Sequence, residues 1–174
     1  MSDIVDIEKA RIVIRAKKGF KNWGRQFEYS FGLSTCMEDI PDKALAFLAE
    51  GNQNSSFYYY DLIMNVKDLG SGFGFNELEP ADKLTTIDIH LFLLDRARYE
   101  YMKRLGWLDS YPGEEYPLVE LIIYFDDLAP DIQAKPAVLS RNHPCYSEYI
   151  SKNLFEREEI VRRLISEALN RISQ

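Results

Sequence analysis

The feature that most constrains the fold is an unusually apolar stretch near the middle of the chain, residues 83–105. Six of the eight residues from Ile87 to Leu94 are apolar, and at helical spacing they point in every direction around the axis. A helix that is apolar on all sides is normally buried on all sides. We therefore predict that Lys83–Leu105 is the central helix of the protein and that the other elements pack around it.

Length and composition favour a single globular helical domain over residues 1–174. The chain has 46% hydrophobic and 28% charged residues, which is typical of packed proteins of this size. No run approaches the length of a membrane span, and the first residues lack the pattern of a secretory signal. The two cysteines, Cys36 and Cys145, form no CxxC motif, which suits a reducing compartment. We expect a soluble, cytoplasmic protein without membrane contact.

Most of the remaining chain also has helical patterns. Apolar spacing predicts a helix over residues 3–18, with Gly19 as its C-terminal stop. Further helices are predicted from Pro41 to Gly51, over residues 57–69 and after Pro144. The predicted fold class is therefore mainly α, an irregular bundle of about five or six helices around the central one.

The patterns of two segments are compatible with either a helix or a strand. Residues 27–33 alternate apolar and polar side chains, so a minor β element is expected near them. If residues 11–16 were also extended, the two segments would form a hairpin, but the helical spacing of residues 3–18 favours a helix. Residues 118–128 are almost wholly apolar and would fit a buried strand. Their one-sided helical spacing and the preceding Pro117 favour a helix there too.

Charge is distributed unevenly along the chain. The net charge is −7, which argues against nonspecific binding to nucleic acid. Residues 1–26 hold seven Lys and Arg against three acids, whereas residues 109–134 hold seven acids and no base. We expect the basic segment 11–25 and the acidic segment 109–131 to contact a protein partner or a second copy of the chain.

Polar residues inside the central helix are the sharpest site candidates. Asp88 and Asp95 are seven residues apart and share a face, whereas His90 lies on roughly the opposite side. Buried polar groups need hydrogen-bond partners from other elements. A pocket between helices would place Tyr59 and Tyr60 of the 57–69 helix beside them. These five residues are the candidate ligand-binding residues, and a purely structural role in the core is the reading we favour.

The other motifs lack the spacing that their chemistry needs. The glycines of residues 70–74 match neither GxGxxG nor a P-loop, and His143-Pro144-Cys145 fixes a thiol and an imidazole across a proline. The acids of residues 109–131 lack the EF-hand pattern. Residues 15–27 interleave cations with aromatics, as RNA-binding segments do, but five cations in an acidic molecule favour a solvated helix face. We expect no metal site and no cofactor.

The functional expectation follows from these patterns together. No nucleophile–base pair, metal motif or nucleotide loop is recognisable, so the first expectation is a non-catalytic interaction or regulatory protein that forms a homo-oligomer. The alternative is an enzyme or a small-ligand-binding protein with an interhelical pocket near Asp88 and His90, where one of these groups would act as acid or base.

Overall fold

The described part of the chain is built almost entirely from helices. The computed structural model describes residues 2–172, with side-chain surroundings from Ile7 onward. In chain order, with η for 3₁₀ helices, the elements are α1 (Ser2–Phe27), η1 (Met37–Asp39), α2 (Asp42–Glu50), α3 (Gln53–Val66), η2 (Gly72–Glu77), α4 (Pro80–Arg104), β1 (Leu108–Ser110), α5 (Leu118–Ile123), α6 (Phe125–Gln133), β2 (Val138–Leu139), α7 (Tyr146–Ile150) and α8 (Leu154–Ile172). The mainly α fold predicted from the sequence is confirmed.

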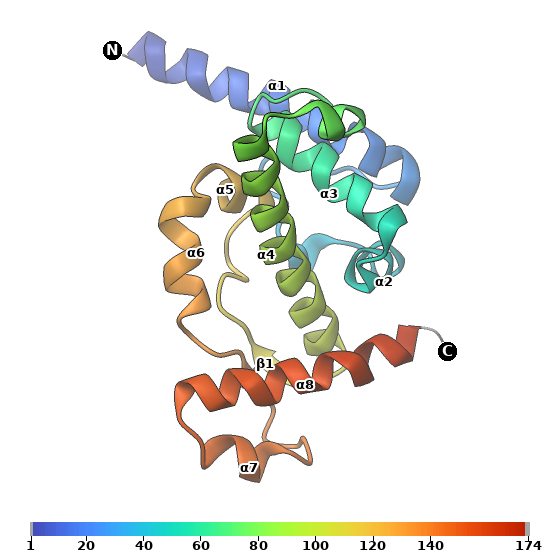
Figure 1. The fold of residues 1–174 in the computed structure, drawn as a ribbon, viewed down its shortest axis with the longest axis vertical. Helices are drawn as coiled ribbons and strands as arrows, with labels where there is room; N and C mark the ends of the chain where they lie inside the picture. Colours follow the sequence, from blue (N-terminus) through green and yellow to red (C-terminus); the bar gives the residue numbers. More distant parts are fainter. Residues whose placement is uncertain (1, 173–174) are drawn as a thin grey trace.

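Helix α4 runs through the middle of the molecule, with α1 and α3 at one end and α8 crossing the other (Figure 1). It contributes to two hydrophobic clusters. Ile89 and Leu93 belong to the cluster shared with α1, α2, α3 and α5, whereas Tyr99 and Met102 belong to the cluster shared with the small sheet and α8. Among residues 2–172, no helix combines the length and apolarity needed to cross a membrane.

The central helix is not buried on every side, however. Leu84 and Leu91 are 63% and 52% exposed, and Asp88 between them is exposed as well. The prediction of all-round burial is therefore wrong for this one face. Helical spacing showed that the stretch is apolar in every direction, but it could not show that the neighbouring helices leave one side uncovered.

The first helix is longer than the sequence indicates, because Gly19 is not its end. A Cβ at Gly19 would lie 3.0 Å from Leu62 Cδ1 and 3.2 Å from Leu62 Cα. The glycine therefore allows α1 to approach α3 closely, and the helix continues for two more turns. Those turns bury Phe20 and Trp23, whose rings meet edge to face with centroids 5.3 Å apart.

The small β element exists but lies elsewhere than at residues 27–33. Strands β1 and β2 form an antiparallel pair in which Leu108 faces Leu139. The segment after α1 is irregular, and its alternation arises because Phe31 packs against Trp23, with ring centroids 5.5 Å apart. Residues 11–16 are helical, so no hairpin joins the two segments. The helix expected over residues 118–128 is confirmed in type, but Tyr124 divides it into α5 and α6.

A buried carboxylate, Glu100, joins α4 to two other parts of the chain. Glu100 is 3% exposed, and its oxygens accept from Arg104 Nε at 3.0 Å and from the Tyr111 hydroxyl at 2.8 Å. Arg104 also donates to the carbonyls of Met37 and Glu38 and pairs with Asp42 at 2.8 Å. The network holds η1 and the start of α2 against the last turn of α4.

Asp61 plays the same part at the other end of the molecule. It is 1% exposed, and its carboxylate accepts from Asn22 Nδ2 at 2.9 Å, Asn65 Nδ2 at 3.1 Å and the Gly72 backbone N–H at 2.8 Å. These bonds tie α1, α3 and η2 together. The η2 backbone approaches Asp61 so closely that a Cβ at Gly72 would lie 2.9 Å from Asp61 Cα.

Replacing Gly72 by alanine tests this close approach. We expect Gly72→Ala to lower the free energy of unfolding by about 1–3 kcal/mol, because the added methyl collides with backbone that cannot rotate away. Gly74→Ala is the matched control in the same 3₁₀ helix, since a Cβ there meets nothing within 4 Å. Urea unfolding of both variants decides the matter, and equal stabilities would contradict the proposed contact.

The Glu100 network makes a second prediction. Removing the cation with Arg104→Gln leaves Glu100 enclosed with only Tyr111 as partner, so we expect a loss of about 3 kcal/mol. Arg163→Gln is the control, because its 3.0 Å pair with Glu148 joins side chains that are 64% and 48% exposed. That pair should contribute less than about 1 kcal/mol. A similar small loss for both variants in denaturant titrations would refute the structural role of the buried pair.

Candidate functional site

The candidate residues of α4 lie on different sides of the helix. Asp88 is exposed to solvent, whereas His90 is 7% exposed and faces α3. Asp95 is mostly covered and accepts a hydrogen bond from Arg162 Nη2 at 2.8 Å, which joins α4 to α8. The structure therefore brings neither carboxylate to His90.

His90 is enclosed by the two tyrosines that the sequence singled out. Its ring centroid lies 4.8 Å from that of Tyr59 and 5.0 Å from that of Tyr60. The Tyr59 hydroxyl donates to the Leu48 carbonyl at 2.9 Å, and Tyr60 stacks on Phe75 with centroids 4.2 Å apart. Both tyrosines are thus held by other contacts. A role of this group in ligand binding stays a prediction.

Two buried polar atoms in this region have no hydrogen-bond partner within the described residues. They are His90 Nε2 and Thr86 Oγ1, one helical turn apart on α4. Burial, and to a lesser extent the positive charge of Arg98, lowers the pKa of His90 to about 4. The imidazole is therefore neutral at pH 7. Arg98 itself is occupied, because it donates to the carbonyls of Ala49 and Glu50 at the end of α2.

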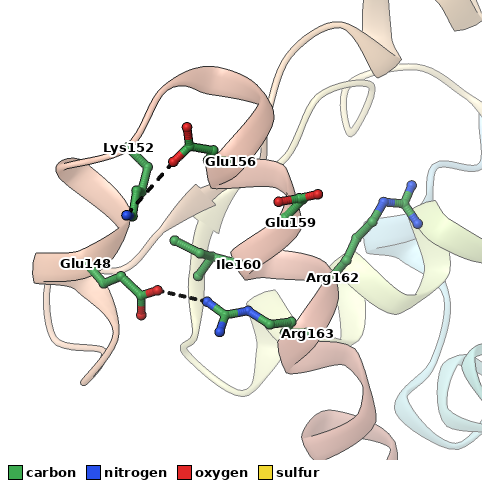
Figure 2. A pocket seen from close by; sticks show the side chains of 7 residues that line it. All are labelled: Glu148, Lys152, Glu156, Glu159, Ile160, Arg162 and Arg163. Atoms are coloured by element: carbon green, nitrogen blue, oxygen red, sulfur yellow. Dashed lines mark hydrogen bonds and ion pairs between the residues drawn. The ribbon is translucent and has the colours of Figure 1, made fainter.

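Among the surface hollows of the described residues, five lie elsewhere, and the candidate residues line none of these five. Figure 2 shows one of about 700 Å³ between α7 and α8. Most of its charges are paired: Glu148 pairs with Arg163 at 3.0 Å and Lys152 with Glu156 at 3.9 Å. Arg162 pairs with Asp95 and Glu158 outside the lining. Such a surface offers a ligand few unpaired groups.

The basic segment forms a continuous exposed face on α1. Six exposed residues spaced three and four apart share this face: Ile7, Arg11, Ile14, Lys18, Lys21 and Arg25. Its cations have no ion pair among residues 7–172, whereas the neighbouring Arg15 pairs with Asp68 at 3.3 Å. The aromatics between these cations point inward, since Phe20 and Trp23 belong to the core. They are not free to stack on nucleic-acid bases.

The acidic segment is exposed as well. Glu114 pairs with Lys103 at 2.7 Å, but the other six acids are exposed and form no ion pair in the described chain: Asp109, Glu115, Glu120, Asp126, Asp127 and Asp131. Three of them lie on α6, on the left of the view in Figure 1. The two oppositely charged segments therefore form no ion pair with each other among the described residues.

The remaining motifs have structural explanations. His143 Nδ1 accepts from the Cys145 backbone N–H at 3.1 Å, so the imidazole stabilises the turn before α7. Burial raises the pKa of the Cys36 thiol, which makes it less nucleophilic at neutral pH. Within the part of the chain that the structure describes, no three His, Cys, Asp or Glu side chains are grouped to hold a metal ion.

Sequence reasoning missed a second group of unpartnered polar atoms, on the side of α4 that faces α8. Arg96 Nε and Glu158 Oε2 are both buried without a hydrogen-bond partner in the described structure. Arg96 is adjacent to Asp95 in a stretch that reads as the start of a charged helix face. The sequence holds no signal that would place its guanidinium in the interior.

Comparisons with known proteins add no family to this description. No family model matches the chain, and neither a curated protein nor a solved structure matches it.

The His90 environment predicts a pH dependence. The ordinary pKa is 6.5 and the folded value about 4, so between these pH values the unfolded chain binds a proton that the folded chain excludes. Lowering the pH through this window should cost about 2–3 kcal/mol of stability through His90 alone. We expect His90→Gln to lose less stability than the parent protein between pH 7 and pH 4 in urea titrations, and His143→Gln to behave like the parent. Identical losses for the parent and His90→Gln would contradict the assignment.

Proposed function

We propose that this chain is a non-catalytic interaction protein that associates with a second copy of itself. The basic face of α1 meets the acidic segment 109–131 of the other copy. The observation that carries this proposal is the exposed row of cations on α1, which forms no ion pair among residues 7–172. Complementary patches of this kind steer association and set its orientation.

The geometry of α1 supports the same proposal. The helix has 26 residues and would span about 39 Å, which is long enough to provide one side of a standard interface. Its N-terminal half extends beyond the neighbouring helices in Figure 1. Ile7 and Ile14 are each 53% exposed on the same face as the cations, so they can bury apolar area once the charges have aligned the two copies.

The cellular setting belongs to the proposal as well. Cys36 and Cys145 are both free thiols and are not close enough to be bonded. Free cysteines persist in a reducing compartment, so we propose that the protein acts in the cytoplasm, with regulation of a process through self-association as its role. A different acidic protein would be recognised by the same face of α1.

A charge-swap experiment tests the association. Two variants each reverse one patch: Lys18→Glu with Lys21→Glu on α1, and Asp127→Lys with Asp131→Lys on α6. We expect light scattering at low salt to show oligomers for the parent protein and monomers for each single-patch variant. The combined four-site variant should associate again, because the two patches are complementary once more. Added salt should dissociate the oligomer by screening exposed charges.

The matched control is Lys43→Glu with Arg141→Glu, which reverses two exposed cations outside α1. This variant has the same net charge as the α1 variant, so it should still associate. Monomers in the parent protein at low salt would refute the proposal. Equal loss in the control would assign the effect to net charge and would refute the role of α1.

A further inference from the structure

One arginine lies in the interior without an acidic partner. Arg96 is 3% exposed, and its Nη1 donates to the Pro112 carbonyl at 2.5 Å. Its guanidinium carbon lies 4.8 Å from the ring centroid of Tyr99 and 5.1 Å from that of Phe92. Its Nε has no partner, and Arg96 forms no ion pair with any residue between 7 and 172. Enclosing an unpaired charge is costly, so this arrangement favours an anion as the missing partner.

Arg96 lines a hollow of about 490 Å³ between the end of α6 and the first turns of α8. Its lining holds three cations, Arg96, Lys135 and Arg162. The one acid in the lining is Glu158. The Arg162 charge is shared, since it pairs with Asp95 at 2.8 Å and with Glu158 at 3.3 Å. The hollow therefore has a positive balance in a protein whose net charge is −7.

Glu158 holds a second atom without a hydrogen-bond partner, and this atom is an acceptor, whereas Arg96 Nε is a donor. One of its oxygens, Oε1, accepts from the Tyr99 hydroxyl, whereas Oε2 is buried and accepts from nothing in the described chain. Two residues that line the hollow thus hold an unused donor, Arg96 Nε, and an unused acceptor, Glu158 Oε2, both buried behind its wall. A ligand that satisfies both must present an anionic oxygen and, next to it, an N–H or O–H group.

The rim of the hollow is apolar. Leu154 and Phe155, the first two residues of α8, are 58% and 73% exposed, and both line it. Large exposed apolar side chains beside a polar pocket are typical of binding sites. They also lie at the positive end of the α8 dipole, which favours a negative group nearby.

We propose that this hollow binds a carboxylate that carries a neighbouring N–H group and an apolar side chain. N-acyl amino acids and the C-terminal residue of a peptide share this chemistry. The carboxylate accepts from Arg96 Nε and pairs with Lys135, the N–H donates to Glu158 Oε2, and the side chain packs on Leu154 and Phe155. The Arg96 and Glu158 side chains turn toward the hollow to make these bonds, a rotamer change that is common on binding.

Titration of the intact protein with N-acetyl-leucine, followed by amide NMR, tests the proposal. We expect chemical-shift changes at Arg96, Lys135 and the start of α8. N-acetylleucinamide lacks the carboxylate and should bind at least about tenfold more weakly, because a hydrogen bond to a charged group is lost. Equal binding of acid and amide, or no binding of either, would overturn the proposal.

Variants at the exposed edge locate the site without disturbing the core. Phe155→Ala and Lys135→Gln should each weaken binding about threefold or more. Their controls are Phe73→Ala, at an equally exposed phenylalanine of η2, and Lys43→Gln on α2, and both should bind as the parent does. Unchanged binding in both edge variants would overturn the location. Arg96→Gln should abolish binding, and the edge variants keep the test decisive if this variant does not fold.

The source of the ligand is settled by a second probe, the peptide acetyl-Gly-Gly-Leu with a free carboxylate. Tighter binding than that of N-acetyl-leucine would assign the hollow to the C-terminus of a peptide, because the extra residues add contacts. Equal binding would assign it to a small N-acyl amino acid. Both results support the proposed carboxylate site, and they are independent of the self-association through α1.

Discussion

The buried pair of Glu100 and Arg104 is the interaction on which much of the structure depends. A carboxylate that is 3% exposed is stable only with a complete set of partners, and these come from Arg104 in the next turn and from Tyr111 in the loop after β1. Arg104 then reaches the carbonyls of η1. A single charged pair thereby fixes the positions of three segments around the end of α4.

The buried polar groups fall into two sets, those whose hydrogen bonds stabilise the fold and those that retain an atom without a partner. Both oxygens of Glu100 and of Asp61 accept hydrogen bonds; Asp61 joins α1, α3 and η2, and Glu100 joins α4 to the loop after β1. His90, Arg96 and Glu158 each retain an atom that bonds to nothing in the described structure. Complete networks stabilise a fold, whereas incomplete ones are where a ligand or an ordered water can bind. Of the incomplete groups, Arg96 and Glu158 line an open hollow, and His90 does not line any of the five described.

Periodicity in the sequence was sufficient to predict the mainly α fold and the central position of α4, since both depend on local spacing. Periodicity gave the wrong local structure where contacts with residues distant in the sequence determine the conformation. Gly19 reads as a helix stop, but the approach of Leu62 explains it, and the alternation at residues 27–33 reflects packing on Trp23. For the candidate site, the sequence placed Tyr59 and Tyr60 beside His90 only as part of the alternative pocket hypothesis, and the structure shows the rings in contact while Asp88 faces solvent. The enclosure of Arg96 did not follow from the sequence, because its hydrogen-bond acceptor Pro112 lies in the loop after β1, and the hollow beside it is lined by α8 and the turn after α6.

The participation of α4 in both hydrophobic clusters has a consequence for how the chain can be divided. A cut near Gly106 would separate residues 1–105 from the sheet and α8, and Tyr99 and Met102 would then face water in the first fragment. The second fragment would lack the helix against which α8 packs. Neither piece holds a closed core, so protein engineering that splits this chain has to leave α4 joined to the sheet and α8.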